Sequence, residues 1–407
     1  MWPRFGPYHL ARLEAAQRAL APNIEIVGLE TASLERLNDW EVADYPVGFT
    51  RVQAFPGRVF EDIPPREMER GITRALDEAN PDAVAIMSYS YPDARAALSW
   101  CRRNHRAAIL ATDTKEDDAE RIRWREAVKS AIVDEFDAAL VSGTPQKRYL
   151  ANLGFAPQNI FVGYNVVDNS FYFERAKGVR EGRSKVLHLP GLDQDGPFFL
   201  SVNRLLPFKN VDGLLEAYAA YRSETDTPWG LLVVGDGPDR GRLECIVREG
   251  KIEGVVFCGY RQAEDIAAYY GRSSALIHPS RKDTWGLVVN EAMAAGLPVI
   301  VSDRVGCRED LVKDGENGYL FDPDDTERLT ELMAKMASAE TDREAMSQRS
   351  LEIVSEFDLD RFVGGLHSAA SVGVRRAGRP ARPLAAAVLF ALRFLSRRVT
   401  SFHTAEL

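Results

Sequence analysis

Two carboxylates, Asp283 and Glu291, stand eight positions apart and bracket the start of an apolar segment with helical spacing. A carboxylate accepts hydrogen bonds from hydroxyl groups, whereas it is repelled by another anion. The two side chains are therefore suited to hold the hydroxyl groups of a sugar and of a ribose on either side of a phosphate. The alternative is structural, with Asp283 capping the helix and Glu291 lying on its exposed surface.

The segment between these carboxylates predicts a binding site for the phosphate itself. Residues 275–280 read as a strand, and the helical pattern that follows ends at Gly296. The first amides of a helix have no acceptor within it, so the amides near Gly286, Leu287 and Val288 can donate to an anion. The helix dipole contributes only about 0.3–1 kcal/mol at an exposed end, so charged side chains must supply the rest.

The elements that position these residues alternate between short apolar runs and longer helical patterns, which is typical of an α/β fold with parallel sheets. The strand-like runs are residues 83–88, 107–112 and 138–143 in the first half, and 198–203, 231–237, 255–260, 275–280 and 298–303 in the second. We expect two doubly wound, Rossmann-like domains, which bind ligands at the carboxyl ends of their strands.

The expected domain boundaries follow from changes in this pattern. The first domain covers residues 1–175, a glycine-rich and charged stretch at 176–197 reads as a linker, the second domain covers 198–365, and a tail covers 366–407. Such a domain normally opens with a full apolar strand, and here Met1–Pro3 alone precede the first loop. The first strand is therefore expected to be short or missing.

The block from Asp283 onward is similar to the carboxylate-x7-carboxylate element of the retaining glycosyltransferases of family 4, the glycosyl transferases group 1. Both carboxylates are usually Glu in that family, so Asp283 is a departure, whereas Glu291 and the continuation NEAMAAGLPVIVSD follow the pattern. The resemblance implies a GT-B fold, with two Rossmann-like domains facing each other across a cleft. It also implies metal-independent, retaining transfer of a sugar from a nucleotide-diphosphate sugar to a hydroxyl acceptor, in bacterial-type polysaccharide, lipopolysaccharide or glycolipid assembly.

The resemblance also assigns roles on the donor side. Asp283 would face the donor sugar and Glu291 the ribose, while Arg204 and Lys209, which follow the strand-like run 198–203, would contact the diphosphate. Fixed cations stabilise the negative charge that a leaving diphosphate gains. The alternative for Arg204 and Lys209 is a pair of solvated surface cations.

The loop at 259–262, with Gly259 and Arg261, is where such enzymes hold the nucleotide base. The run LLVVGDGPDRGRLE (231–244) invites a dinucleotide-binding interpretation, but its last glycine interval is one residue too long for GxGxxG. We therefore interpret this run as a tight turn and expect no cofactor besides the nucleotide-sugar substrate.

The first half resembles the family less closely. FGPYHLARL (5–13) looks like its first loop and helix, so Gly6 and His9 would line the acceptor side. Asp113 stands where the family often has a histidine, and would contact an acceptor hydroxyl or act as a base. The alternatives are a packed or surface histidine at position 9 and a capping or turn role for Asp113.

Composition excludes other classes of function. A net charge of -9 argues against a general nucleic-acid binder. The four cysteines lie far apart, which fits neither a zinc site nor a disulfide framework. No secretory signal or apolar run of about 20 residues is present. The expected location is cytoplasmic, on the inner face of the membrane if the tail docks there.

The tail differs from the rest of the chain because residues 371–405 contain seven arginines and no acidic residue. These arginines lie in and beside the apolar run 383–398. Positive charge together with an apolar run favours docking of residues 374–398 on an anionic membrane surface, close to lipid-linked glycan acceptors. The alternative is a last helix that braces the first domain.

Two rival functions stay open. The same scaffold suits a catalytically weak or inactive nucleotide-sugar-binding protein, with Asp283 as the sign of lost chemistry. A nucleotide-sugar epimerase of similar architecture is the other, although it explains the spacing of the basic and acidic residues less well.

Overall fold

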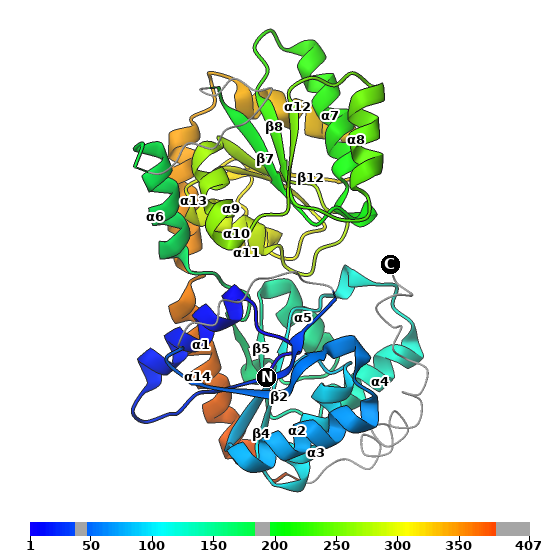
Figure 1. The fold of residues 1–407 in the computed structure, drawn as a ribbon, viewed down its shortest axis with the longest axis vertical. Helices are drawn as coiled ribbons and strands as arrows, with labels where there is room; N and C mark the ends of the chain where they lie inside the picture. Colours follow the sequence, from blue (N-terminus) through cyan, green and yellow to red (C-terminus); the bar gives the residue numbers. More distant parts are fainter. Residues whose placement is uncertain (37–46, 184–195, 380–407) are drawn as a thin grey trace. The chain divides into compact units, whose positions relative to one another are not determined.

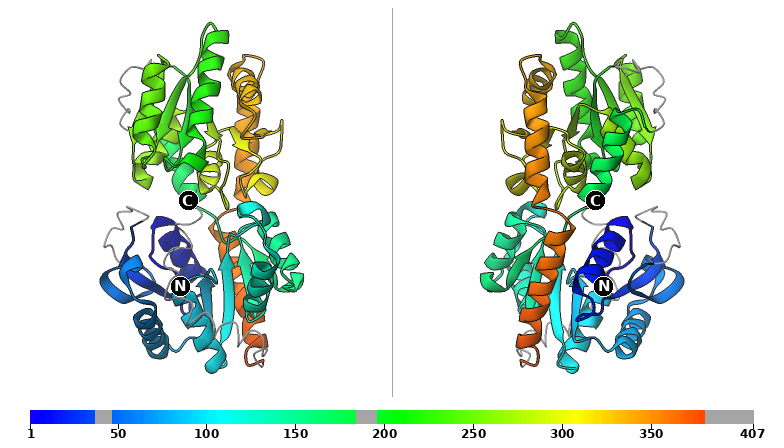
Figure 2. Two further views of the ribbon diagram at one scale, coloured as in Figure 1. Left: turned by 90° about the vertical axis from the view of Figure 1, so that its right-hand side faces the viewer. Right: turned by 90° about the vertical axis from the view of Figure 1, so that its left-hand side faces the viewer.

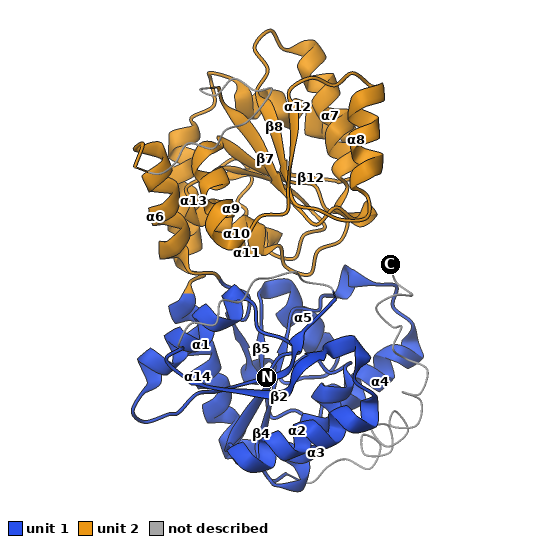
Figure 3. Ribbon diagram, viewed as in Figure 1, with its two compact units in different colours: residues 1–166, 359–407 blue, residues 167–358 orange. Residues whose placement is uncertain are grey.

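The computed structural model describes residues 1–36, 47–183 and 196–379. The chain forms two compact units: unit 1 contains Met1–Val166 and Leu359–Leu407, and unit 2 contains Val167–Asp358 (Figure 3). Each unit is built on parallel strands that alternate with helices (Figure 1). The expected fold class, an α/β chain with two Rossmann-like domains, is confirmed.

Unit 2 contains a six-stranded parallel sheet with the order β12-β11-β10-β7-β8-β9. Its strands are β7 (Phe198–Val202), β8 (Gly230–Val234), β9 (Val255–Gly259), β10 (Ala275–His278), β11 (Val299–Ser302) and β12 (Gly318–Phe321). Because β7 comes first in sequence, the strand order reverses between β7 and β10. Open parallel sheets bind their ligands at such a reversal, beside the carboxyl ends of the two strands.

The helices of unit 2 cover this sheet. They are α6 (Asn169–Arg180), α7 (Val211–Glu224), α8 (Arg240–Glu249), α9 (Ala263–Arg272), α10 (Leu287–Ala294), α11 (Arg308–Leu311), α12 (Thr326–Ala337) and α13 (Arg343–Ser355). Every residue of β7 is buried, which explains its uninterrupted apolar sequence, since a covered parallel strand has no solvent face. All five strands predicted in the second half are present.

The turn after β8 requires a glycine at position 235. Gly235 has a φ of 133°, and a Cβ at this position would lie 1.8 Å from the carbonyl oxygen of Asn203, which follows β7. The two strand ends can approach this closely only because the side chain is absent.

We expect Gly235→Ala to lower the free energy of unfolding by about 3 kcal/mol or more, because neither the φ angle nor the backbone oxygen leaves room for the methyl group. Gly241→Ala is the matched control, since nothing lies within 4 Å of a Cβ there and the position is helical. Thermal unfolding of both variants checks this, and equal midpoints would contradict the steric argument.

Unit 1 contains a four-stranded parallel sheet, β3-β4-β5-β6, and a parallel pair, β1 and β2. Its strands are β1 (Val27–Leu34), β2 (Thr50–Val59), β3 (Ala83–Met87), β4 (Ala107–Thr112), β5 (Ala138–Val141) and β6 (Ile160–Val162). Trp2 N donates to Leu29 O at 3.1 Å, and Met87 N donates to Met1 O at 3.3 Å. The opening segment therefore forms a single bridge to β1 at Trp2 and a backbone hydrogen bond to β3, and no strand precedes β1 among the described residues.

The helices of unit 1 include one from the far end of the chain. They are α1 (Pro7–Leu20), α2 (Pro65–Ala79), α3 (Pro92–Arg103), α4 (Arg123–Val133), α5 (Thr144–Asn152) and α14 (Leu359–Arg376). Helix α14 packs along β3 to β6 and against α1 (Figure 2). Beyond it, Arg379 Nε pairs at 3.1 Å with the fully buried Asp137 carboxylate. The bracing alternative is thus confirmed as far as Arg379, whereas residues 380–398 lie outside the described residues.

The expected domain boundaries were wrong at both crossings between the units. Residues 176–180, expected in a linker, continue α6, which packs against α9 so closely that a Cβ on Gly271 would lie 2.8 Å from Ala176 O. The chain returns to unit 1 at Leu359 and not at 366, because α14 fits the sheet of that unit. Residues 184–195 lie outside the described residues. None of the described helices has the length and apolar character needed to cross a bilayer.

Candidate functional site

An ion pair joins the loops that follow β7 and β10, at the reversal in strand order. Lys209 ends the short 3-10 helix η4 (Pro207–Lys209), and Asp283 lies in the loop after β10. Lys209 Nζ is 2.6 Å from Asp283 Oδ2, and the side chains are 16% and 15% exposed. The backbones are also joined, since Arg281 N donates to Phe208 O at 2.9 Å. The structure therefore brings together two predicted site residues that are 74 positions apart.

His278, the last residue of β10, is a site residue that the sequence did not point to. Its Nε2 lies 2.9 Å from Asp283 Oδ2, the same oxygen that Lys209 contacts. Burial lowers the pKa of His278 below its ordinary value, although Asp283 opposes this effect. The ring is therefore neutral near pH 7, and its Nε2–H donates to the carboxylate.

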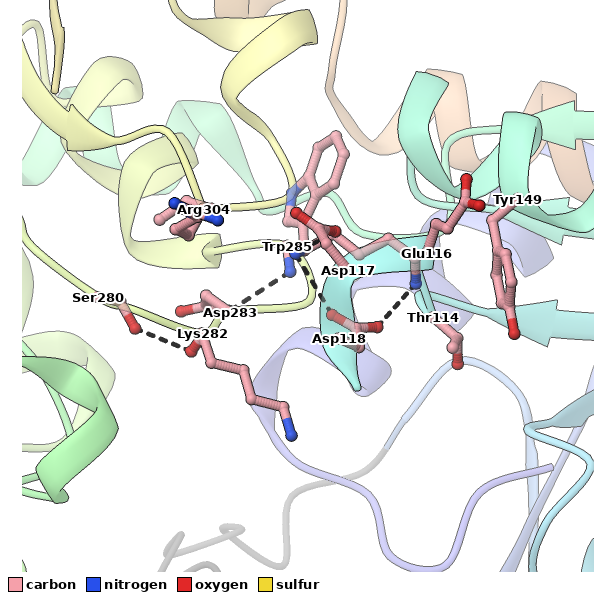
Figure 4. Close-up of polar contacts among 12 residues, drawn as sticks. Thr114, Glu116, Asp117, Asp118, Tyr149, Ser280, Lys282, Asp283, Trp285 and Arg304 are labelled. Atoms are coloured by element: carbon pink, nitrogen blue, oxygen red, sulfur yellow. Dashed lines mark hydrogen bonds and ion pairs between the residues drawn. The ribbon is translucent and has the colours of Figure 1, made fainter. Parts of the chain in front are cut away.

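Asp283 is held as an anion. Burial alone would raise the pKa of the Asp283 carboxyl, but Lys209 and His278 outweigh it and keep that pKa well below its usual range. The second oxygen, Oδ1, accepts from Trp285 N at 3.3 Å (Figure 4). The carboxylate thus has donors on both oxygens without a bound ligand.

Helix α10 begins where the sequence predicts, immediately after Gly286, which has a φ of 94°. Trp285 fixes the start of α10, because its side chain is buried and its Nε1 donates to Asn290 Oδ1 at 2.8 Å. The first helical amides, those of Leu287 and Val288, have no acceptor within the helix. They are therefore free to donate at the start of α10, and binding of an anion by these amides stays a prediction.

The loop after β11 fixes the backbone just before α10. Gly306 N donates to Asp283 O at 3.1 Å, and Cys307 N donates to Trp285 O at 2.9 Å. Val305 packs so closely that a Cβ on Gly286 would lie 2.7 Å from its Cγ1. Loops from β7, β10 and β11 therefore hold Asp283 in place.

Glu291 lies inside α10 and is 1% exposed, so the alternative of an exposed helix residue was wrong. Tyr270, on α9, donates from its hydroxyl to Glu291 Oε2 at 2.7 Å. Tyr270 is a second residue that the sequence did not point to. A buried carboxylate oriented by a neighbouring hydroxyl is suited to accept further hydrogen bonds from a ligand.

The other donor-side residues also lie at the carboxyl edge of the sheet in unit 2. Arg204 follows β7 and is exposed, and its side chain makes no hydrogen bond or ion pair within the described residues. Gly259 ends β9 with a φ of 69°. Arg261, two residues later, donates from Nε to Tyr269 at 3.1 Å. The contacts of these three residues with a donor stay predictions.

In unit 1, Gly6 and His9 cap the start of α1. Gly6 N donates to His9 Nδ1 at 2.9 Å, and the imidazole packs 5.2 Å from the ring of Trp2. Burial, followed by the charge of Arg12, keeps the pKa of His9 well below its ordinary value. The alternative of a packed histidine describes these contacts, and an acceptor role for Gly6 and His9 stays a prediction.

The lowered pKa of His9 predicts a dependence of stability on pH. Its folded pKa lies below the unfolded value of about 6.5, so the stabilisation is complete above that pH and is lost as the pH falls below it. We expect wild type to lose about 1–2 kcal/mol more than His9→Gln between pH 6.5 and pH 5. Urea unfolding at both pH values checks this, with the exposed His367→Gln as control; identical losses in all three proteins would contradict it.

Asp113 follows β4 and lies near Asn165, whose Nδ2 is 3.4 Å from its Oδ2. After it, the buried Lys115 pairs with Asp117 at 2.7 Å, and its amide donates to Asp118 at 2.7 Å. Burial raises the pKa of Asp118 to about 6. These contacts order the loop, while the role of Asp113 toward an acceptor stays a prediction.

Among the described residues, no group of three or more His, Cys, Asp or Glu side chains could hold a metal ion.

Solved structures similar to this chain have the same two-domain architecture. Sucrose-phosphate synthase of Thermosynechococcus elongatus aligns with a TM-score of 0.67 and 20% identity, over 88% of this chain and 90% of that one. The Anabaena protein HepE, in complex with UDP and glucose, aligns with a TM-score of 0.66 and 16% identity, over 91% and 98%. These likenesses show that the chain has the GT-B fold.

Sequence comparison matches residues of unit 2 to a known family. Over 194 residues the chain is 28% identical to N-acetyl-alpha-D-glucosaminyl L-malate synthase of Bacillus anthracis, covering 47% of this chain and 48% of that protein. The chain spans about half or less of the length of several curated relatives that it matches. The family model described as Glycosyl transferases group 1 matches residues 189–352. This part of the chain, which contains Lys209, Asp283 and Glu291, therefore belongs to the glycosyl transferases group 1.

Proposed function

We propose that this protein is a retaining glycosyltransferase that moves a sugar from a nucleotide-diphosphate sugar to a hydroxyl acceptor. The observation that carries the proposal is the contact of Lys209 with Asp283 at the reversal between β7 and β10, next to the start of α10. A cation, helix amides and an ionised carboxylate meet there, which is the set needed for a diphosphate joined to a sugar. The complex of HepE with UDP and glucose supports the same class of donor.

Binding of the donor follows from the charges of the site. Lys209, together with the exposed Arg204, would pair with the diphosphate, and the amides of Leu287 and Val288 would donate to it. Asp283 and Glu291 would accept hydrogen bonds from the sugar and from the ribose. The site would therefore recognise the donor from both ends while keeping carboxylates away from the phosphate oxygens.

The reaction needs the leaving diphosphate to be stabilised. As the glycosidic bond breaks, its electrons pass to the β-phosphate oxygen, and Arg204, Lys209 and the helix amides would stabilise that charge. We propose that the same oxygen takes the proton of the acceptor hydroxyl. The acceptor oxygen then attacks the sugar from the face that the diphosphate leaves, so the anomeric carbon keeps its configuration. These groups supply the charge that a metal ion would otherwise bring, and the transfer is therefore proposed to need no metal.

Thermal unfolding in the presence of UDP, GDP, ADP and TDP tests the proposal. A ligand at 100 times its dissociation constant stabilises the folded state by about 2.7 kcal/mol, so one of the four should raise the midpoint clearly. Release of that diphosphate from its sugar conjugates then measures turnover. Binding without release would favour the nucleotide-sugar-binding alternative, and release with inversion would overturn retention. No binding of any of the four would overturn the proposal.

The proposal for the acceptor is a glycan or lipid-linked glycan, with the tail holding the protein on an anionic membrane surface. We expect a chain cut after Arg379 to lose flotation with anionic liposomes, because the cut removes four arginines and the apolar run 383–398. Cutting there keeps the pair between Arg379 and Asp137. Neutral liposomes are the control, and unchanged flotation of the shortened chain would contradict the membrane proposal.

A further inference from the structure

One oxygen of Asp283 has two donors that differ in mobility. Oδ2 lies 2.6 Å from Lys209 Nζ and 2.9 Å from His278 Nε2. The lysine ammonium ends a flexible four-carbon stem. The imidazole sits at the end of β10, buried and 1% exposed. Lys209 can therefore turn toward a ligand, whereas His278 stays with the carboxylate.

His278 has no other polar task within the described part of the chain. Its Nδ1 is buried and has no hydrogen-bond partner there. Burying a polar atom without a partner costs free energy. The one hydrogen bond of the ring, to Asp283, is the contact that can offset this cost. The orientation of the ring is thus explained by Asp283.

We propose that His278 is a positioning residue, whose Nε2–H holds the Asp283 carboxylate in place while Lys209 changes partner from Asp283 to the donor diphosphate. This inference rests on the proposed function. Without a donor, Asp283 neutralises Lys209, so the ammonium must leave the carboxylate to act on phosphate. Asp283 then remains partly buried, with only His278 and the amide of Trp285 as described donors. A carboxylate facing a sugar needs such a fixed donor, because a misplacement of about 1 Å costs up to about 100-fold in rate.

The exchange changes the charges around His278. The charged groups that act on the ring are Asp283, which favours its protonated form, and Lys209, which disfavours it. When Lys209 turns to the diphosphate, Asp283 acts alone and the phosphates add negative charge. Binding of the diphosphate is therefore expected to raise the pKa of His278.

Two substitutions separate positioning from folding. Gln places its Nε2 amide near the imidazole Nε2 position, so His278→Gln keeps a donor to Asp283, whereas His278→Met fills the space without one. We expect His278→Met to lower the kcat of diphosphate release by about 10- to 100-fold. The affinity for the free nucleoside diphosphate should stay within about twofold, because Asp283 does not contact the phosphates. His278→Gln should restore most of the rate, and His367→Met, on the exposed face of α14, should match wild type.

The full chain with 15N-labelled histidine provides the direct readout. The six histidines can be followed by pH titration with and without the nucleoside diphosphate, and His278→Gln identifies the resonance. A pKa that rises on binding supports the inference, and one that stays unchanged overturns it. Equal kcat values in wild type and His278→Met also overturn it. A wild-type chain that binds no diphosphate and releases none overturns the proposed function itself, which is a different result.

Discussion

Lys209→Ala is expected to lower the rate of diphosphate release by about 100- to 1000-fold, which is the loss seen when one fixed donor to a developing anion is removed. The ammonium lies 2.6 Å from Asp283 and is 16% exposed, so it can reach a ligand without leaving the site. Its charge would stabilise the departing diphosphate more than the bound donor, and kcat should therefore fall more than affinity. Single-turnover release of the diphosphate measures this directly.

The same substitution is expected to cost less in stability than in rate. Removing one partner of a fully buried ion pair costs about 3–5 kcal/mol. Asp283 is 15% exposed and keeps His278 as a donor, so the loss should be smaller. Lys282→Ala is the matched control, because Lys282 is the adjacent basic residue and its ammonium makes no ion pair within the described residues (Figure 4). Equal loss of rate in both variants would show that only the general positive charge matters.

Glu291→Gln is expected to weaken binding of a nucleoside diphosphate by about 10- to 100-fold, because a hydrogen bond to a charged group contributes about 1.5–3 kcal/mol. Gln replaces one acceptor oxygen of Glu291 by an amide donor. A ribose hydroxyl that donates to Glu291 in the wild type has no acceptor in its place. Helix α10 should persist, since both residues favour helix. Titration calorimetry of wild type and variant measures the change.

A ligand without ribose hydroxyls sharpens this experiment. Wild type should bind the 2′,3′-dideoxy nucleoside diphosphate more weakly than the natural one, whereas Glu291→Gln should bind the two almost equally. Tyr270→Phe keeps the carboxylate and removes only the hydroxyl that orients it at 2.7 Å, so this variant should still discriminate between the two ligands. If Glu291→Gln still discriminates between the two ligands as wild type does, the ribose assignment is wrong.

The strands of unit 2 and helix α10 were predictable because continuous apolar sequence corresponds there to complete burial. β7, β8, β10 and β11 are apolar runs covered on both faces, and α10 is an apolar helix that ends at Ala294 before Gly296. The sequence signal and the physical cause coincide there. The same holds for Asp283 and Lys209, whose loops follow strands that meet in the sheet.

Unit 1 was harder to predict because its first strands break the usual pattern. β1 buries Glu30, which accepts from Arg51 at 2.6 Å and from Gln53 at 2.7 Å, both on β2. β2 itself contains Pro56 and Gly57 and is largely accessible. A buried carboxylate and a strand with turn residues do not resemble strands in a single sequence, since only their pairing explains them.

His278 and Tyr270 were missed for a related reason. Each acts through one contact with a predicted carboxylate on another element, and neither belongs to a motif with fixed spacing. The crossing of α14 was anticipated only as an alternative, because its position depends on the fit of Gly365 and Ala369 against strands more than 200 positions earlier. Packing between distant segments leaves no periodic signal in the sequence.

The discontinuity of unit 1 affects how the chain is made on the ribosome. All of Val167–Asp358 must be synthesised between the last strand of unit 1 and the helix that covers it. At about 5–20 residues per second, this interval lasts roughly 10–40 s. During that time the contiguous unit 2 can fold, while the face formed by Ile109 and Ala138 remains uncovered. The nascent chain therefore carries an exposed apolar surface on which a chaperone would act until translation passes α14.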